Sequence, residues 1–191
     1  KLLNVTVDQG ALNALVDNGG MIRADGGQAL LTTQAAGSLL ANVVNNTGVI
    51  QAQTLVTGEN GTIRLLGGTQ SGTLNVAGTL DASAPTGGNG GAIETSAARV
   101  NIASGVILTT AAPSGTTGTW LISPQDFTVG SLSTDNISGP TLSAQLVTNS
   151  VTISTAAAGG GDIHVNNAIA WTASSTPTTL SLLADGNVNI N

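Results

Sequence analysis

Ten carboxylates are the main acid–base groups of this chain, and their spacing bears on whether it could be an enzyme. Asp25 and Asp81 each lie near the end of a similar strand-like block, so they could approach each other on neighbouring turns of a repeat. A glycosidase or lyase needs paired carboxylates of this kind. Most of the ten, however, lie near Gly or Asn, where Asp commonly accepts hydrogen bonds from turn backbone. The pattern therefore favours turn-capping carboxylates and leaves a carbohydrate-active enzyme, a lyase or glycosidase, as the alternative. The ten are Asp8, Asp17, Asp25, Glu59, Asp81, Glu94, Asp126, Asp135, Asp162 and Asp185.

Other catalytic and metal-binding arrangements lack their defining residues. His164 is the single histidine and there is no cysteine, so the sequence predicts neither a zinc site nor a thiol nucleophile. No Gly-x-Ser-x-Gly motif occurs, and the glycine run 87–91 lacks the lysine of a phosphate-binding loop. Residues 159–162 are only near to a calcium-binding repeat and occur once, whereas such sites need tandem copies. The sequence therefore predicts that the chain is not an enzyme, with no catalytic, cofactor-binding or metal-binding residues and no cofactor.

Trp120 and Trp171 are the largest side chains and admit two interpretations. An exposed tryptophan can stack on a sugar ring, whereas a buried one fills a wide part of a core. Each lies in an apolar stretch, at residues 119–123 and 168–173. We therefore expect both to pack in the core or at an end of the fold.

The charge content excludes several classes of partner. Only 7% of residues are charged and the net charge is -6, with four basic residues that form no cluster along the sequence. Binding to nucleic acid or to anionic lipid requires a basic patch, so neither is expected. No apolar run reaches the length of a membrane-spanning helix, so stable membrane insertion is not expected either. Regularly placed clusters of Val, Ile and Leu argue against disorder.

A repeat of about 28 residues organises the first part of the chain. The pattern Gly-x-(Ile/Leu)-x-(Ala/Thr) occurs four times, with its central residue at Ile22, Ile50, Leu80 and Ile107, which are 28, 30 and 27 residues apart. Two further strand-like blocks accompany it, such as residues 62–66 and 74–76 in the second repeat. Each repeat therefore reads as three short strands separated by Gly-, Asn-, Ser- and Pro-containing corners.

This pattern predicts an all-β fold, a right-handed parallel β-helix (β-solenoid) with about 27–30 residues per turn. Each strand is too short to bury its apolar face alone, whereas stacked turns pair every backbone group with the turns above and below. Alternation is expected to point one apolar set inward: Ile22, Ala24, Ile50, Ala52, Leu80 and Ala82. Regular turns are expected over residues 1–123, and a less regular continuation over 124–191.

The continuation is expected to hold strands and one helix. Residues 140–146 predict a short helix with Pro140 in its first turn. Residues 35–41 fit either a short helix or a wide corner. The strand-like stretches are residues 127–129, 151–153, 162–165, 168–173, 179–183 and 187–190.

Several stretches resemble the filamentous-haemagglutinin family of two-partner-secreted exoproteins. They are residues 7–16, 25–31, 78–85, 118–127, 161–171 and 187–191, in that order along nearly the whole chain. The chain is most similar to the segment that follows the export-recognition domain of these proteins. It departs from the family at Ser123, where Asp is more common before the proline.

The resemblance implies a secreted or bacterial cell-surface location. Members of this family cross the outer membrane through a dedicated β-barrel transporter, fold outside as a β-solenoid fibre, and act in adhesion, aggregation or biofilm formation. The expected function is therefore a non-catalytic adhesin segment, a stiff shaft. Its expected partners are the outer-membrane β-barrel transporter during export, then host-cell, bacterial or glycan surfaces, and other fibres through self-association.

Overall fold

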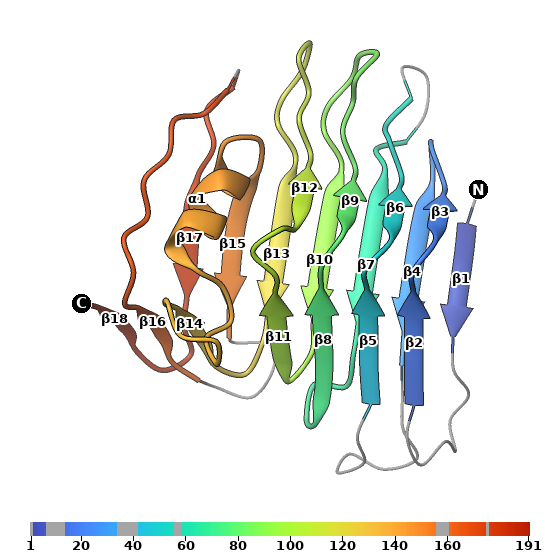
Figure 1. Ribbon diagram of the computed structural model, residues 1–191. Coiled ribbons are helices and arrows are strands. Elements are labelled where there is room, and N and C mark those ends of the chain that lie inside the picture. Colours follow the sequence, from blue (N-terminus) through green and yellow to red (C-terminus); the bar gives the residue numbers. More distant parts are fainter. Residues whose placement is uncertain (1, 7–13, 34–41, 56–58, 156–160, 175) are drawn as a thin grey trace.

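A computed structural model describes residues 2–6, 14–33, 42–55, 59–155, 161–174 and 176–191. It is a stack of parallel coils, a β-solenoid of about five turns (Figure 1). The predicted fold class is therefore confirmed. The predicted helix or corner at 35–41 lies outside the described residues.

Four parallel sheets run along the stack. Sheet A consists of β1 (Leu2–Thr6), β4 (Gln28–Thr32), β7 (Thr62–Leu66), β10 (Ala92–Ser96), β13 (Thr119–Ser123), β15 (Ser150–Ser154) and β17 (Leu180–Leu183). Sheet B consists of β2 (Ala14–Asn18), β5 (Asn42–Asn46), β8 (Gly72–Val76) and β11 (Arg99–Ile102). Sheet C consists of β3 (Met21–Arg23), β6 (Val49–Gln51), β9 (Thr79–Asp81) and β12 (Ile107–Thr109), and sheet D of β14 (Phe127–Val129), β16 (Ile163–Val165) and β18 (Val188–Ile190).

The core lies inside the coils, where alternate residues of each strand stack in columns. Ile22 pairs with Ile50 and Ile50 with Leu80, while Ile63 stacks on Ile93 in sheet A. Of the residues predicted to point inward, five are fully buried and Ile22 is partly buried against the core. Burying apolar side chains on one face of every strand supplies the driving force that no single strand could supply alone.

The fourth copy of the repeat is shifted by one residue from its predicted register. Leu108, not Ile107, stacks on Leu80. Leu108 is buried, whereas Ile107 is 59% exposed on the outer surface. The central residue predicted at position 107 was therefore wrong, because the turn between β11 and β12 holds four residues where its counterparts hold two, so Gly105 lies three residues before the inward Leu108 whereas Gly78 lies two before Leu80. A shift of one residue turns every side chain of a strand to the opposite face.

Close approach between coils fixes at least one corner glycine. Gly78 has φ +63°, and a Cβ atom there would lie 2.2 Å from the carbonyl oxygen of Gly48 on the preceding coil. Only glycine tolerates both the backbone conformation and the contact. The corners therefore stack on one another as tightly as the strands do.

A helix covers the end of sheet C. Helix α1 (Gly139–Leu146) begins after Ser138, whose side-chain oxygen accepts a hydrogen bond from the Thr141 N–H, and Pro140 lies in its first turn, as predicted. The last strand of sheet C, β12, borders α1 and the turn that follows it (Figure 1). There the Gln145 side chain accepts a hydrogen bond from the Leu108 N–H at 3.0 Å, and Asn149 Nδ2 donates to the Leu108 carbonyl at 3.2 Å.

Beyond β12 the coils consist of sheets A and D. Five of the six strands predicted after residue 123 are present as β14 to β18. The sixth, predicted at 168–173, is wrong, because this segment has no strand pairing. Its residues are largely exposed, so alternation of apolar and polar side chains there does not reflect burial on one face.

Candidate functional site

The two carboxylates that could have formed a catalytic pair are separated by an intervening coil. Asp81 lies on the third strand of sheet C and Asp25 follows the first, with β6 between them. Gln53, which follows β6, donates its backbone N–H to Asp25 at 3.0 Å and its side-chain amide to Asp81 at 2.7 Å. The carboxylates brace neighbouring coils through this glutamine, which agrees with the turn-capping interpretation.

Asp25 is the carboxylate with the most hydrogen bonds in this corner. It accepts from Arg23 Nε at 2.5 Å and from Gln51 Nε2 at 2.9 Å, besides the Gln53 N–H. Burial alone raises the pKa of Asp25, but the hydrogen bonds from Gln51, Arg23 and Gln53 together outweigh it, so the pKa lies below its ordinary value. A carboxylate held in the charged form in this way is suited to bracing and unsuited to donating a proton.

Asp126 and Asp162 also brace the stack. Asp126 Oδ1 accepts a hydrogen bond from the Asp162 N–H at 3.0 Å, and Asp162 Oδ1 accepts one from the Asn187 N–H at 2.7 Å. The corner before sheet D is thus a ladder of acidic and amide side chains, each bonded to the next coil. Two of the four residues that resemble a calcium motif, 159 and 160, lie outside the described residues.

The histidine and tryptophans occupy three different settings. Trp120 is fully buried and its Nε1 donates to Thr95 Oγ1 at 3.0 Å, so its predicted core role is confirmed. Trp171 was predicted to pack in the core or at an end of the fold; it is 37% exposed, in a segment without strands. Its Nε1 bonds to Thr178 Oγ1 at 3.0 Å. His164 is partly buried in β16 beside Asn189.

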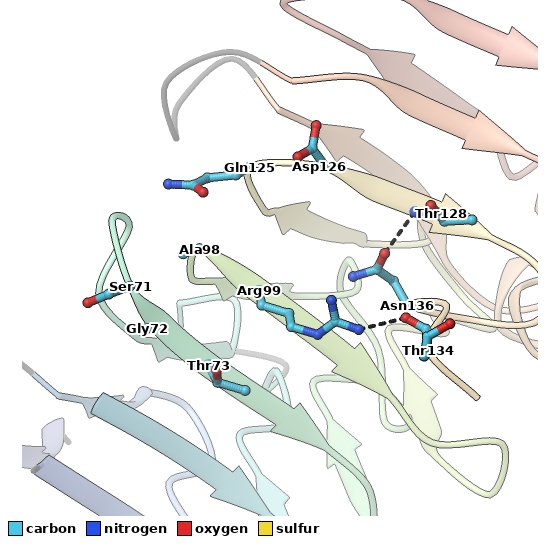
Figure 2. Close-up of a pocket in the computed structure, with 10 residues that line it drawn as sticks. All are labelled: Ser71, Gly72, Thr73, Ala98, Arg99, Gln125, Asp126, Thr128, Thr134 and Asn136. Atoms are coloured by element: carbon cyan, nitrogen blue, oxygen red, sulfur yellow. Dashed lines mark hydrogen bonds between the residues drawn. The ribbon is translucent and has the colours of Figure 1, made fainter. Parts of the chain in front are cut away.

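One hollow on the described surface lies beside Arg99, at the corner between sheets B and D (Figure 2). It has a volume of about 330 Å³. Its polar lining comes from β8, β11, β14 and the loop that follows β14, and comprises Ser71, Gly72, Thr73, Ala98, Arg99, Gln125, Asp126, Thr128, Thr134 and Asn136.

Asn136 forms a fixed wall of this hollow. It is buried, its Nδ2 donates to the Val100 carbonyl at 2.8 Å, and its Oδ1 accepts from the Thr128 N–H at 2.8 Å. Its own carbonyl accepts the Ile102 N–H, so one residue satisfies the free edge of β11 where sheet B ends. Asn136 therefore lines the hollow and also satisfies the edge strand at which sheet B ends.

Arg99 lies across the hollow and is oriented by the same loop. Its Nη2 donates to the Thr134 carbonyl at 2.6 Å, as Figure 2 shows. Arg99 also lines a second hollow of about 360 Å³, together with residues that include Asn75, Asn101 and Asp135. Arg99 therefore borders both hollows, which together form the Arg99 groove.

Sequence reasoning missed this groove, although the repeat holds a signal for it. Arg64 lies opposite Glu94 in the register of sheet A and pairs with it, and Arg23 pairs with Asp25 two residues on. Arg99 lies opposite Thr73, so the 26-residue offset brings no acid to it. An arginine without an acidic partner at the repeat distance is a recognisable feature once the register is known.

The described residues contain no group of three or more His, Asp or Glu side chains placed to hold a metal ion. In the same part of the chain, no helix is long and apolar enough to cross a membrane.

No protein-family model, curated protein or solved structure matches this chain. The resemblance to filamentous-haemagglutinin exoproteins therefore stays a prediction, as do the absence of enzymatic activity, the secreted location and the expected partners.

Proposed function

We propose that this chain is a non-catalytic shaft segment of a secreted or cell-surface bacterial adhesin, where it holds binding regions away from the cell. The observation that carries the proposal is the axial course of the chain. The N- and C-termini lie at opposite ends of the stack, with the coils between them (Figure 1). Segments of this shape can be joined in series into a longer rod.

Side-chain ladders add to the stiffness that a spacer needs. On the outer face of sheet B, Asn75 Nδ2 donates to Asn45 Oδ1 at 2.8 Å, and Asn101 Nδ2 donates to Asn75 Oδ1 at 2.8 Å. In the core, Asn18 Nδ2 donates to Asn46 Oδ1 at 2.8 Å. Each coil is thus tied to the next by side chains as well as by strand pairing, which opposes bending between coils.

Export of the chain through an outer-membrane β-barrel transporter is part of the proposal. It rests on the family resemblance, and it is compatible with a chain that has no cysteine and therefore no disulfide to block passage of an unfolded polypeptide. The same proposal extends to adhesion, aggregation and biofilm formation by fibres that contain this segment.

The test removes one coil without changing register. Deleting residues 20–47 joins Gly19 to Gly48 and removes 28 residues, which equals the separation of the paired Met21 and Val49. The Arg99 groove is left intact. The deletion is made in the native gene in the producing bacterium. Surface display is measured by antibody labelling of intact cells, and attachment and aggregation are compared at matched display.

Unchanged attachment at equal display is the expected result, because a spacer shortened by one coil of about 4.8 Å still holds the binding region out. Lost attachment at equal display would place the binding surface in the deleted coil, and the shaft proposal would then be wrong. Absence of the protein from intact cell surfaces and culture medium would contradict the proposed location.

A further inference from the structure

Arg99 differs from the other arginines of the chain in lacking a carboxylate partner. Arg23 and Arg64 each lie within an ion pair, whereas Arg99 belongs to none among the described residues. Its single hydrogen bond runs from Nη2 to the neutral Thr134 carbonyl. A guanidinium offers five N–H donors in a planar fork, so most of these remain directed at the groove or at solvent.

The groove around Arg99 is preformed. Asn136 is held by four hydrogen bonds to strands β11 and β14, and Asp135 Oδ2 accepts the Leu132 N–H at 2.8 Å, which closes the loop above Arg99. On the opposite wall, Gln125 Nε2 donates to the Thr69 carbonyl at 2.8 Å. Groups fixed in this way lose little conformational freedom when a ligand binds.

We propose that the Arg99 groove binds a saccharide that carries a carboxylate, with the carboxylate on the Arg99 guanidinium and the sugar hydroxyls along the uncharged polar side chains of the walls. Arginine matches a carboxylate through two parallel N–H···O bonds. Thr73, Thr128 and Asn101 line the two hollows on either side and offer hydroxyl and amide groups that can donate to and accept from sugar hydroxyls. The combined volume suits a short oligosaccharide.

The surrounding charges favour a ligand with few negative charges. Asp126 lines one hollow and Asp135 the other, and the whole chain carries a net charge of -6. A polyanion such as nucleic acid would be repelled, whereas one carboxylate per binding unit needs only the one arginine. An acidic peptide is less well matched, because most of the lining residues are polar and the hollows are shallow.

This site goes beyond the shaft role and does not depend on it. A shaft can carry a groove or lack one, and the coil deletion 20–47 leaves every groove residue in place. The two proposals can therefore fail separately.

The test measures binding of defined probes to the purified 191-residue chain by titration calorimetry. The acidic probes are sialyllactose and trigalacturonate; lactose is the neutral control, and a Glu-rich hexapeptide is the acidic non-sugar control. Arg99→Gln is compared with Arg64→Gln, which removes the same charge from the outer face of sheet A. Unfolding midpoints of both variants are measured to show that they remain folded.

The expected result is binding of at least one acidic saccharide, weakened about tenfold or more by Arg99→Gln and little changed by Arg64→Gln. Arg99→Lys is expected to fall between them, because it keeps the charge and loses the planar fork. Binding of lactose or of the peptide as tight as that of both acidic sugars, equal losses in the two Gln variants, or no binding of either acidic sugar would overturn the proposal.

Discussion

At the scale of single residues, most polar side chains of this solenoid act on the backbone of a neighbouring coil. Asp25, Asp126 and Asp162 each accept a backbone N–H from the coil that follows. A carboxylate in that position satisfies a donor at a corner where the strand ladder is interrupted. Such bonds give individual acids a structural role.

Asp25 gives the first prediction. Because its folded-state pKa is lowered, its stabilising contribution is fully present above the unfolded value of about 3.9 and is lost as pH falls through the folded-state pKa. Asp25→Asn is expected to destabilise the chain by about 1 kcal/mol at pH 7, and by less at pH 3. Urea unfolding at both pH values measures the difference. Asp17→Asn, at an exposed strand position, is the control. An Asp25→Asn cost that is equal at both pH values would contradict the linkage.

The buried pair of Trp120 and Thr95 gives the second prediction. Thr95→Val removes the acceptor of the Trp120 Nε1–H and leaves a buried donor unsatisfied, at a cost of about 1–3 kcal/mol. In the Trp120→Phe background the same change is expected to cost less, because no indole N–H remains to be satisfied. Chemical unfolding of the unaltered chain, Thr95→Val, Trp120→Phe and the double variant gives the coupling free energy between the two side chains. Strictly additive costs would show that the bond contributes no coupling.

The position of a single residue could be predicted from the sequence only where that residue kept the register of the repeat. Inward positions such as Ile50 and Leu80 were predictable from alternation alone. Ile107 was not, because a longer turn before β12 changed the distance from the corner glycine to the inward residue. Arg99 was not either, because its importance depends on the absence of an acid across the register and on a loop more than 30 residues away.

At the scale of elements, the main change along the stack is that sheets B and C end at β11 and β12 and sheet D begins at β14. A parallel sheet cannot end without leaving a row of unpaired backbone groups. Here Asn136 covers the edge of β11, and Gln145 and Asn149 cover the edge of β12. The helix was predictable from its proline and its composition. Its capping role was not, because that requires knowing which strand edge it meets.

Gln145 tests this capping role. Its Oε1 accepts the Leu108 N–H at 3.0 Å, and its Nε2 donates to the Val106 carbonyl at 3.2 Å. Gln145→Leu keeps a side chain of similar volume and leaves both buried backbone groups without these partners. We therefore expect the free energy of unfolding to fall by about 2–4 kcal/mol. Gln28→Leu, the same change at an exposed position of β4, is expected to stay within about 0.5 kcal/mol. Denaturant midpoints compare the two variants, and equal effects would exclude a capping role.

At the scale of the whole molecule, the coil is the unit that can be added or removed. Its length is set by strand pairing, which joins residues 28 and 30 apart in successive coils of sheet C. The corners can vary, so the repeat drifts without breaking the ladders. This explains why the sequence predicted the fold class and the approximate period, although individual turns differ in length.

The final prediction tests whether stability depends on keeping whole coils in register or on the number of residues retained. Deleting residues 20–47 removes β3, β4 and β5 together, and Asn18 then takes the place of Asn46, whose Nδ2 donates to the Ala77 carbonyl at 3.0 Å. This variant is expected to fold cooperatively and to be shorter by about one strand spacing of 4.8 Å in solution scattering. Deleting only residues 20–33 removes half as many residues but joins β2 directly to β5, with no strand of sheets A or C between them. We expect the shorter deletion to be the more damaging, with a lower unfolding midpoint by circular dichroism. If the longer deletion were the less stable, stability would follow the amount of chain retained, and the coil would not be the unit of this fold.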